Sequence, residues 1–283
     1  MAQMPEKDKE LLEEIDFLKE KYFTYDLPVP FCGLMMYPVS VRNYNEFLTS
    51  NVCFLLNKND DPKGVMMSHL DYLVSKMQDE TEGGMWSMRF SRLLELIFHF
   101  KNGYKCEKCG KNVSFEDFIA KVEGLRQRYE AGEDLGDNIN IYECECGGTL
   151  REMIKLSKDE KTNKTILIVD GKTITNNDFY KLRRIALYQN LPDYKDDSWV
   201  DKAIRDDQAA KVELESKTRG SVKASLERKI LCLSTELSYK LEDIYNMPMR
   251  KFIMSLNIID KKISYIAERI GLMTGMVSTK NGY

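Results

Sequence analysis

Four of the seven cysteines occur as two closely spaced pairs, C-E-K-C-G at residues 106–110 and C-E-C-G-G at residues 144–148. Two thiolates one or two residues apart can bind the same ion, because the chain between them makes a tight turn that glycine accommodates. Two such pairs complete a tetrahedral shell of sulfur, which suits zinc. The spacing therefore predicts one structural Zn²⁺ bound by Cys106, Cys109, Cys144 and Cys146.

A shell of four thiolates is a closed site. It leaves no open position for a catalytic water, so we expect the metal to stabilise the fold and not to react. Free thiols that merely lie near one another usually sit in apolar surroundings, whereas these four lie among Glu, Lys and Gly. Iron–sulfur ligation has the same ligands, and the spacing alone leaves it open as an alternative to zinc.

The rest of the chain contains no second chemical centre that its motifs would reveal. Cys32, Cys53 and Cys232 lie in apolar sequence contexts, which are typical of core thiols. A nucleophilic cysteine needs a histidine partner, and both histidines, His69 and His99, lie on stretches with helical patterns. The sequence has no glycine-rich phosphate loop, no Gly-x-Ser-x-Gly and no His-Glu-x-x-His. We therefore expect a protein that is not an enzyme.

The charges of the chain nearly cancel, with 42 basic residues against 45 acidic ones. A protein that coats nucleic acid is usually strongly basic, so this balance argues against that role. Apolar runs such as Leu93–Phe100 are far shorter than the roughly 20 residues that cross a bilayer. The charged N-terminal residues do not resemble a signal peptide. We expect a cytoplasmic protein without a membrane partner, whose cysteines are reduced or bound to metal.

The elements that must position the cysteines are mainly helical. Ser114 is a capping residue for a helix between the two cysteine pairs, and the residues flanking each pair are expected to form short strands. Thr165–Val169, the turn Asp170-Gly171 and Lys172–Thr175 predict a β-hairpin. Helical periodicity predicts further helices at residues 6–22, 41–56, 65–77, 85–100, 114–129, 176–189, 195–217 and 221–236, and in a long C-terminal element.

This order of elements predicts a mainly α fold, a helical bundle-like domain with an inserted small zinc-ribbon-like α+β module. Residues 1–102 are expected to form an N-terminal helical region, and residues 103–156 the zinc-binding insertion. Residues 157–283 are expected to form the β-hairpin, followed by a C-terminal helical region.

The C-terminal element carries a heptad seam. Its apolar residues recur at alternating steps of four and three, which gives a narrower stripe than most core-facing helices show. Two interpretations are open: the seam packs on this protein's own helices, or a partner or second copy shares it. The seam consists of Phe252, Leu256, Ile259, Ile263, Ile266, Ile270 and Met273.

Two long segments resemble a known family. The run SLERKILCLSTELSYKLEDIYNMPMRKFIMSLNIIDKKISYIAERIGLMTGM resembles the C-terminal part of tail and baseplate assembly proteins of tailed bacteriophages. The run PVSVRNYNEFLTSNVCFLLNK is similar to baseplate hub proteins of contractile-tailed phages, and together the likeness covers residues 28–100 and 175–277. The resemblance implies a non-enzymatic minor baseplate or hub component, or an assembly chaperone. It also implies location in the host cell cytoplasm or the virion. The implied partners are other phage tail or baseplate proteins, or a second copy of the chain.

A zinc-ribbon regulator that binds nucleic acid is the alternative function. Segment 237–252 has the pattern of two short helices around a turn, as in helix-turn-helix proteins, although apolar residues dominate its second helix. Glu107, Glu143 and Glu145 beside the ligands argue against nucleic acid, which we do not expect as a partner. The basic residues in favour are Lys105, Lys108, Lys111, Lys217, Arg219, Lys223, Arg228 and Lys229.

Overall fold

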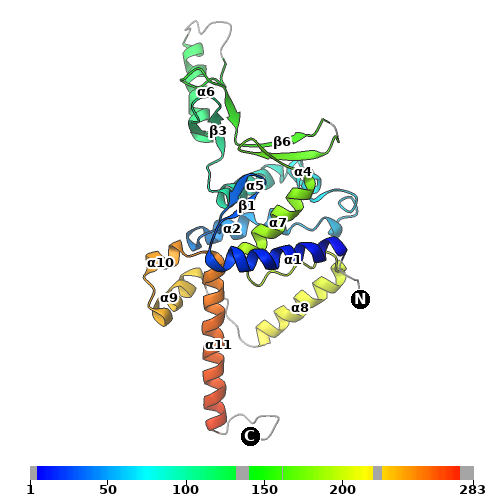
Figure 1. Cartoon of the computed structure of the whole chain (residues 1–283), viewed down its shortest axis with the longest axis vertical. Coiled ribbons are helices and arrows are strands. Elements are labelled where there is room, and N and C mark those ends of the chain that lie inside the picture. The colour runs from blue at the N-terminus through cyan, green and yellow to red at the C-terminus, as the bar shows by residue number, and fades with distance from the viewer. Residues whose placement is uncertain (1–4, 132–139, 161, 219–224, 275–283) are drawn as a thin grey trace. The chain divides into compact units, whose positions relative to one another are not determined.

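The computed structural model describes residues 5–131, 140–160, 162–218 and 225–274 (Figure 1). It is mostly helical, with 59% helix, 13% strand and small sheets, which confirms the mainly α class. The chain divides into two compact units, each built from separate stretches of sequence. Unit 1 comprises Met1–Asp26, Pro38–Tyr44 and Leu187–Tyr283, and unit 2 comprises Leu27–Tyr37 and Asn45–Ala186.

Unit 1 is built from helices. Its first helix, α1 (Glu6–Lys21), lies within the predicted range 6–22 and buries Leu11, Ile15 and Leu18. The 3₁₀ helices η1 and η2, the helix α8 and the three C-terminal helices complete the unit. Their bounds are η1 Phe23–Tyr25, η2 Val41–Asn43, α8 Lys202–Thr218, α9 Leu226–Leu237, α10 Leu241–Asn246 and α11 Met249–Met273.

One apolar cluster holds η2, α9, α10 and the first half of α11 together. Val41, Leu233, Ile244 and Phe252 are almost fully buried in it, as is Ile259 farther along α11. The chain on both sides of Val41 is fixed by backbone hydrogen bonds from Val41 N to Met247 O and from Met249 N to Val39 O. The start of α11 is therefore part of a core and not a projecting surface helix.

The residues of the heptad seam differ in burial along α11. Phe252 and Ile259 are 0% and 2% exposed, whereas Ile263 and Ile266 are 52% and 45% exposed. In Figure 1 the second half of α11 extends beyond α9 and α10. The seam thus packs on this chain's own helices only as far as Ile259. Among the helices in the described ranges, none is long and apolar enough to span a membrane.

Unit 2 contains a helical core formed by residues on both sides of the cysteine module. Phe54 and Phe90 both make edge-on ring contacts with Phe179, at centroid distances of 5.8 and 6.0 Å. The predicted helix 41–56 is broken into η2, α2 and α3, and the predicted helix at 65–77 begins only at His69. The elements are β1 Val29–Phe31, β2 Leu34–Met36, α2 Tyr44–Ser50, α3 Val52–Leu55, η3 Lys58–Asp60, α4 His69–Met77, α5 Gly83–Phe98 and α7 Asn176–Asn190.

Side-chain caps explain where two of these helices start. The Ser68 hydroxyl accepts a hydrogen bond from the Asp71 amide at 3.0 Å, and this cap sets the start of α4 four residues after the predicted one. Ser114 accepts from the Asp117 amide at 3.0 Å, as the sequence predicts, and starts α6 (Phe115–Glu130). In unit 1, Asp201 accepts from the Ala203 amide at 2.8 Å, and α8 begins there instead of near residue 195.

The cysteine module is organised on a three-stranded antiparallel sheet in the order β4-β3-β5, with α6 following β4. These strands are β3 Gly103–Cys106, β4 Asn112–Ser114 and β5 Leu150–Glu152. Cys106 lies opposite Leu150 in the β3–β5 ladder. Because β3 leads into the first cysteine pair and β5 follows the second, this ladder brings the two pairs together.

The predicted hairpin is confirmed and is part of a larger sheet. β7 (Thr165–Val169) and β8 (Lys172–Ile174) pair across the Asp170-Gly171 turn, where both residues have positive φ angles. β6 (Ile154–Lys158) pairs with β7 along its whole length, which the sequence did not predict. The expected module boundary at residue 156 therefore falls inside a strand.

Candidate metal centre

The turns after each cysteine pair have the backbone geometry that the glycines allow. Gly110 and Gly147 both have φ of 72°, and their amides donate to the carbonyls of Cys106 and Cys144 at 2.9 and 2.8 Å. A Cβ atom at Gly148 would lie 2.8 Å from the Cys106 sulfur, so this position admits only glycine without displacement of a ligand. The glycines of both motifs are therefore part of the site.

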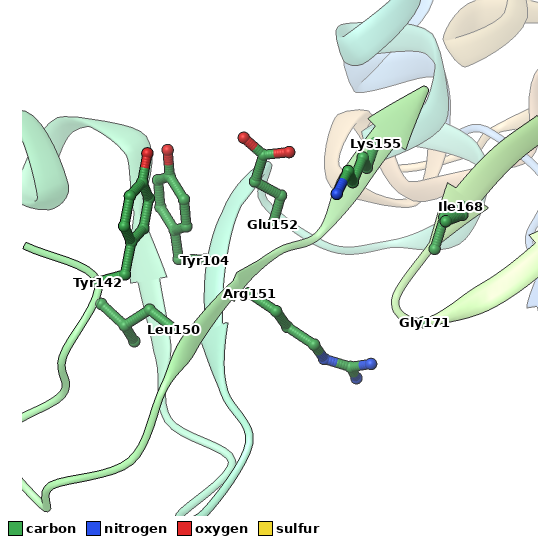
Figure 2. A pocket seen from close by; sticks show the side chains of 8 residues that line it. All are labelled: Tyr104, Tyr142, Leu150, Arg151, Glu152, Lys155, Ile168 and Gly171. Carbon is green, nitrogen blue, oxygen red and sulfur yellow. The ribbon is translucent and has the colours of Figure 1, made fainter. Parts of the chain in front are cut away.

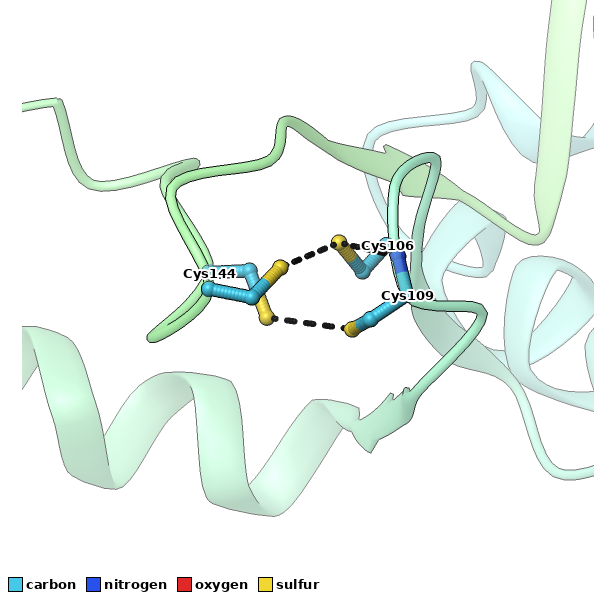
Figure 3. A group of neighbouring side chains, drawn as sticks. Cys106, Cys109 and Cys144 are labelled. Carbon is cyan, nitrogen blue, oxygen red and sulfur yellow. Dashed lines mark hydrogen bonds between the residues drawn. The ribbon is translucent and has the colours of Figure 1, made fainter.

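The structure brings all four predicted cysteines together. Their sulfur atoms all lie within 4.8 Å of one another, and Figure 3 shows the labelled three converging on a common point. The Cys106 and Cys146 sulfurs are 3.5 Å apart, and those of Cys109 and Cys144 are 3.8 Å apart. A tetrahedral zinc site with metal–sulfur bonds of about 2.3 Å has sulfur–sulfur separations of about 3.8 Å. These two separations are close to that value, and the cluster of four sulfurs is compatible with one bound ion.

The electrostatics of the four sulfurs favour a bound cation. The Cys109 amide donates to the Cys106 sulfur, and this hydrogen bond lowers the pKa of the Cys106 thiol to about 6. Hydrogen bonds with the Cys106 and Cys109 sulfurs raise the pKa of the Cys146 thiol to about 12. At neutral pH the Cys146 thiol therefore keeps its proton, which these hydrogen bonds hold. A divalent ion would displace that proton and hold all four as thiolates.

The core around the site is small. It consists of Tyr104, Cys106, Phe118, Cys144 and Leu150, two of which are the ligands themselves. The Tyr104 and Phe118 rings stack with centroids 4.0 Å apart and supply most of its apolar mass. A module of about 50 residues with so small a core is expected to need an additional constraint such as a metal.

Polar contacts tie the two cysteine turns to each other. Lys108 Nζ donates to the Cys146 carbonyl at 3.0 Å, and Lys111 forms an ion pair with Glu145 at 2.9 Å. Lys121 of α6 donates to the carbonyls of Ile141 and Glu143 ahead of the second turn. The basic residues of the first turn are thus used to organise the module.

A second set of ion pairs links the module to the hairpin sheet, and the sequence analysis missed it. Lys105 of β3 and Arg151 of β5 both donate to the Asp170 carboxylate, at 2.9–3.0 Å. A Cβ atom at Gly171 would clash with the Arg151 guanidinium, so the turn needs glycine both for its φ of 73° and for this contact. The Asp-Gly pair signalled the turn; its partners lie 19 and 65 residues away.

A pocket of about 500 Å³ lies beside the module (Figure 2). The Tyr104 and Tyr142 hydroxyls point to the same side as the Glu152 carboxylate, whereas Arg151 points away toward Gly171. Neither cysteine, histidine nor serine is found among the described residues that line it: Tyr104, Tyr142, Leu150, Arg151, Glu152, Lys155, Ile168 and Gly171. The lining offers aromatic faces and mixed charges, but no nucleophile paired with a base.

Both histidines have structural partners within unit 2. His69 Nδ1 lies 2.7 Å from the Arg183 guanidinium, and the ring stacks on Tyr180. Burial and the neighbouring cations lower the pKa of His69 to about 2, so its imidazole is neutral at physiological pH. His99 stacks on Tyr37 with centroids 4.2 Å apart, and burial lowers its pKa.

The three remaining cysteines differ from one another. Cys53 is 2% exposed, as predicted for a core thiol, and Cys232 is partly buried against the unit 1 cluster. Cys32 is exposed, so its prediction as a core thiol is wrong. It occupies the β1–β2 turn with Gly33, and both residues have positive φ angles, which places the side chain at the tip of a hairpin.

The assignment of the centre rests on the residues of this chain. Its four sulfur ligands, their sequence spacing and their separation are the observations from which a metal is inferred. Comparison of the chain with protein-family models, with curated proteins and with solved structures finds no match in any of the three.

Proposed function

We propose that this chain is a non-enzymatic assembly protein of a phage tail or baseplate, a minor baseplate or hub component or an assembly chaperone, stabilised by one structural zinc ion. The closed shell of four sulfurs supports a structural and not a catalytic metal, since it leaves the metal no free position for substrate or water. The phage part rests on the resemblance of residues 28–100 and 175–277 to tail and baseplate proteins.

Zinc is the metal that these ligands support best. It prefers four thiolates in a tetrahedron, and the sulfur separations of 3.5 and 3.8 Å suit one small ion. An iron–sulfur cluster has several metal and sulfide atoms and needs a wider cage, although its protein ligands are also cysteines. The proposed zinc fixes two turns and one sheet, and its role is to order the module that carries them.

The function is tested by capture from infected cells. A tagged chain produced from the phage genome is expected to copurify with tail or baseplate proteins, identified by mass spectrometry against an unrelated tagged phage protein. A Cys109→Ser chain captured in parallel separates the contribution of the metal module from that of the helices. Absence of tail and baseplate proteins from the capture throughout infection would contradict the proposal.

The alternative, a nucleic-acid-binding regulator, has less support. Lys105, Lys108 and Lys111, the cations that favoured it, are bound to Asp170, the Cys146 carbonyl and Glu145. In a helix-turn-helix, the start of α11 would be the helix that contacts DNA bases. Its residues Met249 and Phe252 are buried in this structure. Arg228 is exposed, whereas Arg219, Lys223 and the Lys217 side chain lie outside the described residues.

We therefore predict that the chain does not bind duplex DNA at physiological salt. Non-specific DNA-binding proteins have dissociation constants of about 10⁻⁴ to 10⁻⁶ M at physiological salt, and their affinity falls steeply as the salt concentration rises. Fluorescence anisotropy of labelled duplex DNA at protein concentrations in this range therefore tests the prediction. Salt-sensitive binding that Lys223→Glu with Arg228→Glu abolishes would establish the regulator. The matched charge reversal Lys9→Glu with Lys21→Glu on α1 is the control.

A further inference from the structure

The second half of α11 exposes an apolar stripe. Ile263, Ile266, Ile270 and Met273 are 52%, 45%, 56% and 85% exposed, and every residue from Asp260 to Ile270 is classed as exposed. The same stripe is buried farther up the helix, where α9 and α10 cover Phe252 and Ile259. One continuous heptad seam is thus covered in its first half and open in its second.

The open half of the helix lacks the packing that normally stabilises an amphipathic helix in water. About four turns of helix gain little stability from backbone propensity alone, and amphipathic helices are normally stabilised by packing of the apolar face. Four large apolar residues on one narrow stripe, with Lys262 and Arg269 beside it, instead match the layout of a coiled-coil strand.

The side chains of the seam indicate what covers it. In the open half, Ile263 and Ile270 are at heptad position a, and Ile266 and Met273 are at position d. Isoleucine at both a and d favours three or four strands over two, because β-branched side chains pack poorly at the d layer of a dimer. A seam of this composition is suited to further copies of the same helix.

The flanking charges decide the direction of the strands. Both g positions of the open half, Lys262 and Arg269, are cationic, and an antiparallel pair would place g beside g, so that cations repel. A parallel arrangement places g beside e of the next heptad, so that Lys262 faces Ala267 of its neighbour. Lys262 also lies 3.7 Å from Glu236 of its own chain, so Arg269 contributes most of the repulsion in the antiparallel case.

We propose that three or four copies of this chain associate through a parallel coiled coil of their α11 helices, formed by Ile263, Ile266, Ile270 and Met273. The contact begins where the intramolecular one ends, because α9 and α10 occupy the seam only as far as Ile259. The inference goes beyond the proposed function, since it stands whether or not the protein belongs to a phage tail.

Light scattering coupled to size exclusion tests the assembly on the full chain. The wild type is expected to have three or four times the 32.9 kDa mass of one chain at high concentration and to dissociate on dilution. Ile263→Ser with Ile270→Ser should reduce the mass to that of one chain and leave the circular dichroism of the remaining helices intact, since both residues are exposed in the single chain.

The control is a matched pair on another face of the same helix. Ile258 and Tyr265 are 64% and 60% exposed and lie outside the seam, so Ile258→Ser with Tyr265→Ser should leave the oligomer unchanged. A wild-type mass that stays at one or two chains, or equal loss of mass in both variants, would overturn the proposal.

Ala267→Glu tests the strand direction. In the parallel arrangement the new carboxylate faces Lys262 of the neighbour, and the midpoint concentration of dissociation should fall by roughly twofold for each ion pair gained. In an antiparallel arrangement e faces e, the new carboxylates repel, and the midpoint would rise. A rise would therefore overturn the parallel contact.

Discussion

Cys109→Ser is expected to release the metal and to unfold the module of residues 103–153, while the helical parts of both units persist. Serine is a poor zinc ligand, and the five-residue apolar core of the module is too small to hold its sheet without the ion. Structural zinc contributes on the order of 10 kcal/mol to the folding of comparable modules. Elemental analysis should find about one zinc per wild-type chain and much less in the variant.

Limited proteolysis locates the damage. New cleavage sites are expected between residues 103 and 153, together with nearly unchanged circular dichroism, because most helices lie outside the module. Cys32→Ser is the control, since Cys32 is exposed and lies in a different turn. Full metal content in both Cys109→Ser and Cys144→Ser would show that the ligand set is wrong, and iron together with inorganic sulfide in place of zinc would identify a cluster.

Phe252→Ala is expected to lower the stability of unit 1 by about 3–5 kcal/mol. Phe252 is fully buried in the cluster that joins η2, α9, α10 and α11, and its ring makes an edge contact with Tyr44. Truncation removes apolar contacts and leaves a cavity that the surrounding helices fill only in part. Urea denaturation followed by circular dichroism should show an earlier transition for the helices of unit 1.

Ile258→Ala is the matched control for that substitution. It removes an apolar side chain from the same helix, but Ile258 is 64% exposed, so the expected loss is well below 1 kcal/mol. Alanine also favours helix at both positions, which removes propensity as an explanation. If the two variants unfolded at the same denaturant concentration, the first half of α11 would not be a core element.

Local features could be predicted from the sequence because nearby residues determine them. The turn at each cysteine pair, the Ser114 cap and the Asp170-Gly171 turn each depend on interactions within a few residues, and the structure has all of them. The mostly helical composition follows from periodicity in the same way.

Features that depend on distant residues could not be predicted. Lys105, Arg151 and Asp170 meet through two different sheets, and no spacing in the sequence indicates their contact. The heptad seam is uniform from Phe252 to Met273, yet α9 and α10 cover only its first half, so periodicity alone does not give its burial. Cys32 was misassigned because its apolar neighbours concealed a turn of positive φ.

The places where the cysteine module leaves and rejoins the rest of unit 2 lie beside each other. The Met153 amide donates to the Gly103 carbonyl at 2.8 Å, so the first and last residues of a segment of about 50 residues are joined by one hydrogen bond. Insertions with adjacent ends can be lost, shortened or exchanged with little disturbance of the host fold. Because its ends are adjacent, the module could be replaced by a short turn without redesign of the helices on either side of it. For the same reason it could be inserted into a loop of another protein.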